Sequence, residues 1–204
     1  MTEHPNGGPT ADPTADPTAD LALRAAVLEL ERHASKGGWD QPPQLFALVL
    51  TEELLAAEPG LAAMLEVDTD ADLTGSLTPI EQEALSPDQP LEEVLTQVMW
   101  PPEVHGTAVA VERLVLPPSV ADLPEDPAAA QEVAATHPDR EEVRMVVGAT
   151  RGGSTYCALR LRSHDEDRAV IEGPALVPAL LELLQATLLA EPSAGARERR
   201  PDEE

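Results

Sequence analysis

The sequence predicts an α+β fold, with a mostly antiparallel sheet whose helices pack mainly on one face of a single domain. Three short runs of alternating apolar and polar residues, separated by turn residues, follow one another within 140–174. Helical patterns lie before and after these runs. Strands that are adjacent in sequence and joined by short turns pair antiparallel, and helices grouped outside them are typical of α+β domains.

The first two runs predict a β-hairpin whose register can be counted from its loop. Residues 151–153 form a three-residue loop, and its last residue, Gly153, suits the left-handed conformation that such a turn needs. Counting outward predicts the pairs Val147 with Cys157, Met145 with Leu159 and Val143 with Leu161. These apolar side chains then share one face, because alternate residues of a strand point the same way. A shift of one residue would break this match.

The opposite face of the predicted sheet carries arginines on a chain that is otherwise acidic. A third run at 168–172 is expected to place Ile171 beside Leu159 and Ala169 beside Leu161. The same register puts the candidate binding residues on the other face: Arg144, Arg160, Arg162 and Arg168. We expect this face to be open to solvent or to a partner, with Arg144 directly opposite Arg160. Like charges in that position are destabilising.

Two explanations for this arginine face stay open. Glu142, Glu172 or a covering acidic loop can neutralise the guanidinium groups, since structural ion pairs are common. Alternatively, the face binds an anionic ligand or an acidic partner segment, because the planar guanidinium group holds carboxylate or phosphate in a bidentate manner.

The chain begins with a predicted disordered leader at 1–20, which is rich in Pro and repeats Ala-Asp-Pro-Thr. Such short polar units bury no apolar surface. Asp20 is a good N-cap for a predicted helix at 21–35, in which every third or fourth residue is apolar. This helix opens the single domain, which is expected at 21–190.

The middle of the chain predicts short elements separated by prolines. Pro42 and Pro43 stiffen an extended connector at 39–43. The expected elements are a strand at 44–50, a helix at 52–57 capped by Thr51, a short helix at 59–65, an acidic loop at 67–75, a strand at 77–83, a helix at 88–99 and a strand at 107–116. Pro79 indicates that the strand at 77–83 lies at a sheet edge.

Helical segments flank the arginine-bearing strands. A linker at 123–126 and a short Ala-rich helix at 127–136 precede them. After them, Leu176, Leu180, Leu181, Leu184 and Leu188 give the strongest amphipathic pattern of the chain. This last helix is expected to cover the apolar face, with Leu184 toward Met145 and Leu159. Residues 191–204 contain few apolar side chains, so a disordered charged tail is expected there.

The formal net charge of −25 limits the classes of partner. Such a charge repels phosphate backbones and anionic lipids, so we expect neither nucleic-acid nor membrane binding. No apolar run approaches the length of a membrane span. The N-terminus lacks the pattern of a signal peptide, and the single Cys157 excludes an intramolecular disulfide, which together predict a cytoplasmic protein.

Candidate chemistry is sparse. The chain contains none of the common catalytic, phosphate-binding or zinc motifs, so no catalytic residue, metal ligand or cofactor is predicted. The polar cluster at 164–167 resembles a solvated hairpin loop more than a cation site. Cys157 falls on the apolar face and is expected to be a buried thiol. Trp39 and Trp100 stand beside Pro-Pro pairs, where packing is favoured over an exposed docking patch.

Four segments carry a family resemblance: 38–48, 100–106, 111–118 and 137–144. With them, the chain resembles an uncharacterised family of small acidic proteins from high-GC Gram-positive bacteria, over residues 23–188. The family has no established activity, so the resemblance implies no site residues. One Lys against twelve Arg is consistent with a GC-rich genome.

Two functions of different classes remain open from the sequence. The first is a non-enzymatic interaction module, an adaptor or chaperone-like domain that uses the acidic body and the arginine-lined sheet face. The second is an enzyme whose active site cannot be recognised from one sequence. The lack of any catalytic motif favours the first.

Overall fold

The computed structural model describes residues 17–61, 73–83, 85, 89–116 and 133–189 of the 204-residue chain. Its elements are, in chain order, α1 (Pro17–Lys36), β1 (Gln44–Leu50), α2 (Thr51–Ala57), β2 (Leu77–Glu81), α4 (Leu91–Leu95), β3 (Gly106–Val115), β4 (Glu141–Thr150), β5 (Thr155–Leu161), the 3-10 turns η1 (Arg162–His164) and η2 (Asp167–Ala169), β6 (Ile171–Gly173) and α6 (Pro178–Leu189). The predicted α+β class is confirmed.

The strands form one antiparallel sheet of six strands in the order β2-β1-β3-β4-β5-β6. The predicted hairpin register is confirmed, because Val147 pairs with Cys157 and Arg144 pairs with Arg160. In β6, Ile171 lies opposite Leu159 as predicted. The third strand begins later than expected, however, because Ala169 belongs to η2 and pairs with no strand residue.

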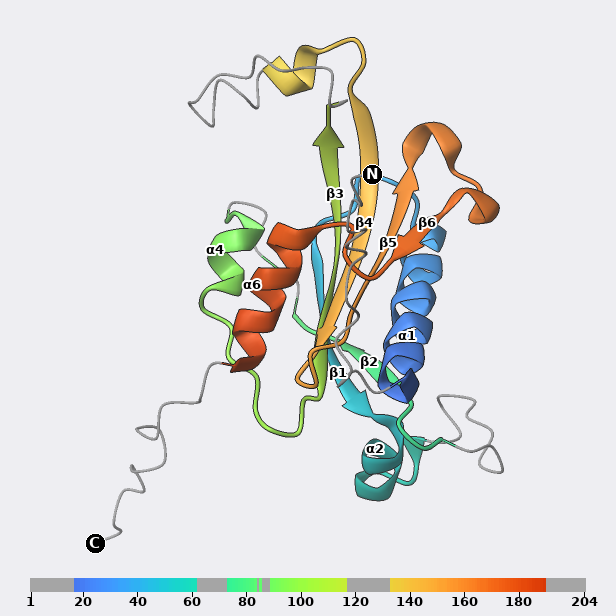
Figure 1. Cartoon of the computed structure of the whole chain (residues 1–204), viewed down its shortest axis with the longest axis vertical. Coiled ribbons are helices and arrows are strands. Elements are labelled where there is room, and N and C mark those ends of the chain that lie inside the picture. Colours follow the sequence, from blue (N-terminus) through green and yellow to red (C-terminus); the bar gives the residue numbers. More distant parts are fainter. Residues whose placement is uncertain (1–16, 62–72, 84, 86–88, 117–132, 190–204) are drawn as a thin grey trace, which may run out of the picture.

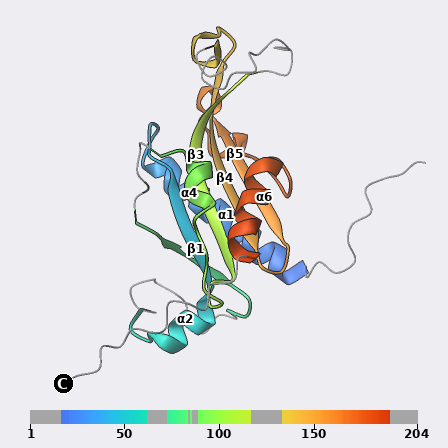
Figure 2. The same ribbon diagram turned by 90° about the vertical axis from the view of Figure 1, so that its left-hand side faces the viewer.

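Helices cover both faces of the sheet, which corrects the expectation that they pack mainly on one. Figures 1 and 2 show α1 on one side of the strands and α4 with α6 on the other. Each side has its own cluster of buried apolar residues. The sheet is therefore the central layer of three, and the face that carries the arginines is closed.

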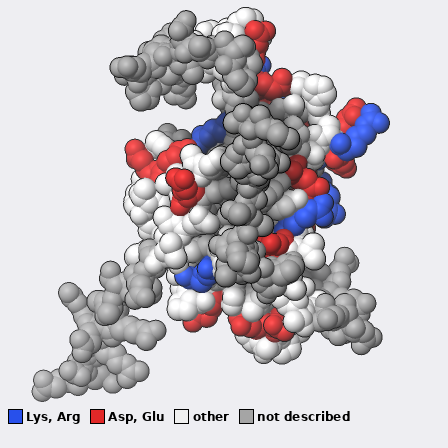
Figure 3. Space-filling view, in the orientation of Figure 1, with Lys and Arg blue, Asp and Glu red and all other residues white. Residues whose placement is uncertain are grey.

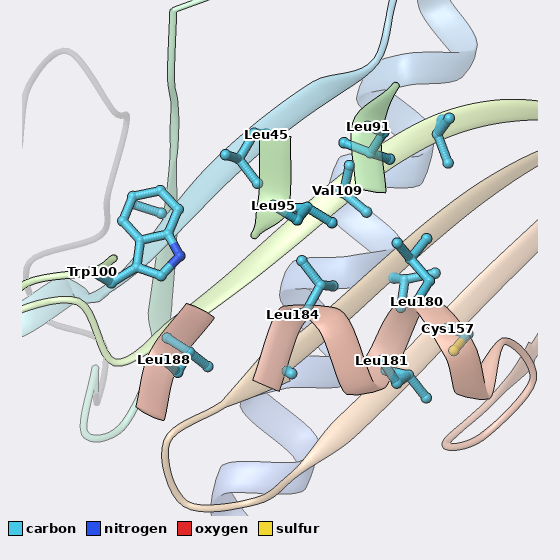
Figure 4. Packing of buried hydrophobic residues seen from close by; sticks show 14 of the residues in the cluster. Leu45, Leu91, Leu95, Trp100, Val109, Cys157, Leu180, Leu181, Leu184 and Leu188 are labelled. Atoms are coloured by element: carbon cyan, nitrogen blue, oxygen red, sulfur yellow. The ribbon is translucent and has the colours of Figure 1, made fainter. Parts of the chain in front are cut away.

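The α4 and α6 side holds the larger of the two cores. Leu184 is fully buried and belongs to the same cluster as Val147 and Cys157, with Met145 packed against it. Figure 4 shows the leucines of α6 lying against the strands, with Trp100 at the Leu188 end of the helix. The predicted position of the last helix on the apolar face is thus confirmed.

The α1 side is lined by small residues that let the helix approach closely. Ala108, Ala158 and Gly148 lie beneath Leu23 and Val27 of α1. A Cβ atom built on Gly148 would lie 2.8 Å from Cγ2 of Val27 and 3.1 Å from Cδ1 of Leu23. A larger residue at this position would therefore push α1 away from the sheet.

Both edges of the sheet are poor templates for further strands. The backbone N–H of Gln82 bonds to the carbonyl of Leu45. In this register the backbone N–H and C=O groups of even-numbered β2 residues point toward β1, and those of odd-numbered residues point to the free edge. Pro79 consequently occupies an outward position, where its missing N–H interrupts the free edge. The other edge strand, β6, has only three residues, and short edge strands limit unwanted pairing.

Several predicted boundaries change. Helix α1 begins at Pro17, so Asp20 lies in its first turn and the prediction of Asp20 as N-cap is wrong. Thr51 is likewise not a cap, because its hydroxyl bonds to that of Thr78 at 2.8 Å. Helix α4 is shorter than the predicted 88–99. The leader up to residue 16, most of the predicted elements at 59–75 and 123–136, and the tail from 190 lie outside the described residues.

Candidate functional site

Two of the four candidate arginines are buried between the sheet and the segment 17–40. Arg144 and Arg160 expose 1% and 2% of their surface. They lie directly opposite each other on β4 and β5, as predicted, but under α1 and the connector that follows it. The expectation of an open arginine face is therefore wrong for this pair.

Arg160 is held by a carboxylate from α1. Its Nε and Nη2 donate to the two carboxylate oxygens of Glu31 at 2.5 and 2.8 Å. Nη2 also donates to Asp167 at 2.9 Å, and Nη1 to Asp165 at 3.4 Å. The hydrogen bonds to Glu31 raise the pKa of Arg160 further above its ordinary value. This bidentate geometry locks α1 onto β5.

Arg144 is held by the neighbouring strand and by the α1–β1 connector. Its Nε and Nη2 donate to Oε1 of Glu112 at 3.2 and 2.7 Å, and Nη2 also donates to the carbonyl of Gly38. The ring of Trp39 covers the guanidinium group, with 4.4 Å between Cζ and the ring centroid. Among the described residues, Nη1 has no hydrogen-bond partner. The pair Arg144–Glu112 therefore anchors the connector to the sheet.

Arg162 fastens the end of the same connector. It donates to both carboxylate oxygens of Asp40 at 3.1 and 3.0 Å and to Glu142 at 2.8 Å. The hydrogen bonds from Arg162 lower the pKa of Asp40 below its usual range. The backbone N–H of Asp40 also donates to Glu112 at 2.7 Å. Trp39 also holds the connector against the sheet side, because its Nε1–H donates to Asp165 at 2.9 Å.

Each of the arginines on this face therefore has its own carboxylates, which explains why Arg144 and Arg160 can lie opposite each other. Glu142 was expected among these partners, and it does bind Arg162. Glu172 instead binds Arg24 at 2.6 Å and the hydroxyl of Tyr156 at 3.0 Å. The hydrogen bond from Arg24 is the main reason that the pKa of Glu172 is lowered. The structure thus favours internal neutralisation for the buried part of the arginine face.

The acidic residues Asp40, Glu112 and Glu142 come together in this network. One carboxylate oxygen from each lies within 4.8 Å of the others, a spacing that could suit a cation. However, these carboxylates are bound to Arg144 and Arg162. Their chemistry in this structure is therefore ion pairing.

The fourth candidate, Arg168, stays accessible. Its side chain is 85% exposed, and its ion-pair partner in the described part of the chain is Glu166, which is itself 61% exposed. Arg168 lines a hollow of about 340 Å³, and a second hollow of about 540 Å³ shares Arg32 and Asp167 with the first. The structure thus separates the four candidates: Arg144 and Arg160 are buried, Arg162 is partly exposed and binds the connector, and Arg168 lies at the surface.

Other sequence-based expectations are met. Cys157 is fully buried, and this burial raises the pKa of its thiol. Trp100 is part of the apolar core, and Trp39 packs on Arg144. The cluster at 164–167 lies at the surface, but Asp165 and Asp167 reach back to Arg160.

The sequence did not predict the partners of the buried arginines, although the position of Glu31 in its helix indicated a paired charge. It follows Leu30 on the helix stripe formed by Leu23, Val27 and Ala34. A charged residue in such a position is almost never buried unless it is paired. A second missed feature is the stretch 37–112, which contains fifteen Asp and Glu residues and no Lys or Arg.

The described residues of this stretch lie on one side of the molecule. Its described part contains β1, α2, β2, α4 and the first residues of β3, so it builds the sheet from the β2 edge to the third strand. Figure 3 shows acidic side chains at the lower end, where α2 lies, and around α4. The glutamates of this region that are exposed include Glu52, Glu53, Glu58, Glu93 and Glu103.

Comparisons with known proteins identify a family and no function. A family model described as PPA1309-like protein matches residues 23–189. No curated protein and no solved structure matches the chain significantly. In the part of the chain that the structure describes, no helix has both the length and the apolar character needed to cross a membrane.

Proposed function

The chain belongs to the PPA1309-like family, and we propose that it acts as a non-enzymatic interaction module whose acidic side binds a basic segment of a partner protein. The observation that carries this proposal is the separation of charge along the chain. Residues 37–112 hold fifteen acidic and no Lys or Arg residues. The described part of this stretch forms β1, α2, β2, α4 and the first residues of β3, on one side of the sheet.

Ion pairs within the chain increase this separation of charge. Most described arginines bind carboxylates of their own chain: Arg24, Arg113, Arg144, Arg160, Arg162 and Arg168. Arg151 is also used internally, because it donates to the main-chain carbonyls of Val104, Leu188, Trp100 and Pro101. The acidic surplus is consequently left at the surface, where it attracts cationic partners and accelerates their association.

The end of the molecule at α2 is the best candidate for the contact. Glu52, Glu53 and Glu58 are exposed on or next to this helix, and Glu103 is exposed in the segment before β3. His105 lies 3.9 Å from Glu53 and places the two segments side by side. A Lys- or Arg-rich segment can bind several of these carboxylates at once.

The test is the binding of a fluorescent oligo-lysine peptide at low and at physiological salt. Glu52→Gln, Glu53→Gln and Glu103→Gln are combined in one variant, and the control combines Asp20→Asn, Glu29→Gln and Asp139→Asn, which remove the same charge elsewhere. We expect the first variant to bind about tenfold more weakly, from several pairs of about 0.5 kcal/mol each. We expect the control to change affinity by less than about threefold. Equal losses in both variants would refute a localised site.

The cellular setting is a further part of this proposal. We infer a high-GC Gram-positive bacterial source, because one Lys against twelve Arg is consistent with a GC-rich genome. We also infer a cytoplasmic location, which the single buried Cys157 supports. Fractionation of cells that express the tagged full chain tests the location.

A further inference from the structure

We propose that the groove between the second half of α1 and the segment 160–172 binds an organic anion with a carboxylate or phosphate head group and a small apolar body. This site lies on the α1 side of the sheet and is independent of the acidic contact proposed above. The two hollows that form it have volumes of about 340 and 540 Å³ and share Arg32 and Asp167.

Cationic side chains converge on this groove from three elements. Arg32 and Lys36 belong to α1, Arg160 to β5 and Arg168 to η2. Within the described residues, neither Arg32 nor Lys36 has a carboxylate partner, since the only hydrogen bond of the Arg32 side chain runs from Nε to the carbonyl of Leu28. Two neighbouring cations without a carboxylate partner are unusual on a chain of net charge −25.

The acidic residues of the groove are mostly occupied. Glu31 is bound by Arg160, Glu172 is bound by Arg24, and Asp167 also contacts Arg160. Glu29 has no ion-pair partner within the described residues. Arg32 and Lys36 are the basic side chains of the groove without a carboxylate partner among the described residues, and the pair of Arg168 with Glu166 is exposed and weak. The walls of the two hollows hold four acidic and four Lys or Arg residues, so this part of an acidic chain carries no acidic surplus.

At the floor of the groove, Arg160 can exchange one of its carboxylate partners for the head group of a ligand. Glu31 fixes the guanidinium group of Arg160 through two hydrogen bonds of 2.5 and 2.8 Å. Asp165 and Asp167 are the other partners of Arg160, and their side chains are 48% and 84% exposed. An anionic head group can therefore replace Asp167 beside Arg160 while Arg32 and Arg168 close around it, because arginine binds planar oxyanions in a fixed geometry.

The walls favour a ligand with an apolar part. Leu28 and Val170 line the smaller hollow, and both pack against the buried cluster on the α1 side. They offer a short apolar surface beside the charged groups. Burial of a small hydrocarbon body against such a surface adds affinity that an inorganic anion lacks.

The basic residues near the end of α1 also have a simple alternative role, since cations there stabilise the helix dipole. This alternative predicts no saturable ligand binding. It also concerns only Arg32, His33 and Lys36, whereas the groove includes Arg160 and Arg168 from the other side.

The test is a titration of the ¹⁵N-labelled full chain with phenyl phosphate, benzoate and inorganic phosphate, followed by NMR at constant ionic strength. We expect phenyl phosphate or benzoate to cause saturable shifts of backbone amides within residues 28–36 and 160–172. We expect inorganic phosphate to bind at least several-fold more weakly than phenyl phosphate. Linear shifts with every probe, or equal affinity for the two phosphates, would overturn the assignment.

Matched variants locate the charge. Arg32→Gln with Arg168→Gln removes two exposed cations of the groove, and Arg113→Gln with Arg140→Gln removes two arginines elsewhere. The groove variant is expected to bind the best probe about tenfold more weakly, and the control within about twofold. A control that loses as much affinity as the groove variant contradicts the site. If a variant folds poorly, the shifts of the wild-type chain still test the site, because they locate binding without any substitution.

Discussion

The buried pair Arg160–Glu31 allows a test of whether charge or packing holds α1 on the sheet. Both side chains are 2% exposed, and three hydrogen bonds of Arg160 at 2.5 to 2.9 Å end on Glu31 and Asp167. Removing one partner of a buried pair leaves a charge without compensation, which costs about 3 to 5 kcal/mol. Replacing both partners by apolar residues of similar volume is often nearly neutral.

The structure predicts unequal effects for the two single variants. In Arg160→Met, the carboxylate of Glu31 stays buried without its two hydrogen bonds, so we expect a loss of about 3 to 5 kcal/mol. In Glu31→Leu, Arg160 keeps Asp165 and Asp167, whose side chains are 48% and 84% exposed. We therefore expect a smaller loss of about 2 to 3 kcal/mol, typical of one charged hydrogen-bonded partner.

The double variant separates the two explanations. We expect Glu31→Leu with Arg160→Met to cost no more than about 2 kcal/mol, because α1 then packs on an apolar surface and the two aspartates remain hydrated. The sum of the singles exceeds this, so the coupling energy is at least about 3 kcal/mol. Urea unfolding at pH 7, followed by circular dichroism, measures all three changes.

A surface pair serves as the control for this cycle. Glu166→Leu with Arg168→Met removes an ion pair of the same kind that is 61% and 85% exposed, and a coupling energy below about 1 kcal/mol is expected there. If the buried cycle gives a coupling energy as small as the surface one, the pair does not hold α1 in place and the reasoning fails.

Three further predictions concern packing, ionisation and thiol access. Leu184→Ala should lower the free energy of unfolding by about 2 to 5 kcal/mol, because Leu184 is fully buried, whereas Leu189→Ala, at a position 76% exposed, should change it by less than about 0.5 kcal/mol in the same urea assay. Arg24→Gln should reduce the stability of the fold at neutral pH. The difference from wild type should vanish as the pH falls through the lowered pKa of Glu172, because a carboxyl group with a lowered pKa stabilises the fold only while it is ionised. Thermal melting measured as a function of pH checks the sign of this effect. Cys157 should react with a thiol reagent much more slowly in the native chain than in urea, because it is fully buried and its pKa is raised; rapid native labelling would contradict the packing of α6.

The sequence by itself determined the local pairing of the sheet. The register of β4 and β5 follows from alternation and from a three-residue loop, because a shift of one residue would turn every apolar side chain to the wrong face. Pro79 likewise marked β2 as an edge strand, since proline cannot donate to a sheet ladder. The leucine pattern of α6 was sufficient to assign it to the apolar face.

Only the tertiary structure decided which face α1 covers and what the arginines do. Alternation placed Arg144 and Arg160 on the same face of the sheet. Because arginine is rarely buried, that face was expected to be open to solvent. Their burial depends on carboxylates that are distant in sequence, since Glu31 is separated from Arg160 by 129 positions and Glu112 from Arg144 by 32. A period of two or 3.6 residues describes the face of one element, whereas the choice of the facing element depends on long-range packing and charge pairing. For this reason the sequence placed Arg144 and Arg160 correctly on β4 and β5, whereas Arg162 and Arg168, predicted on strands, lie in η1 and η2. The fold alone showed that α1 and its connector close over Arg144 and Arg160.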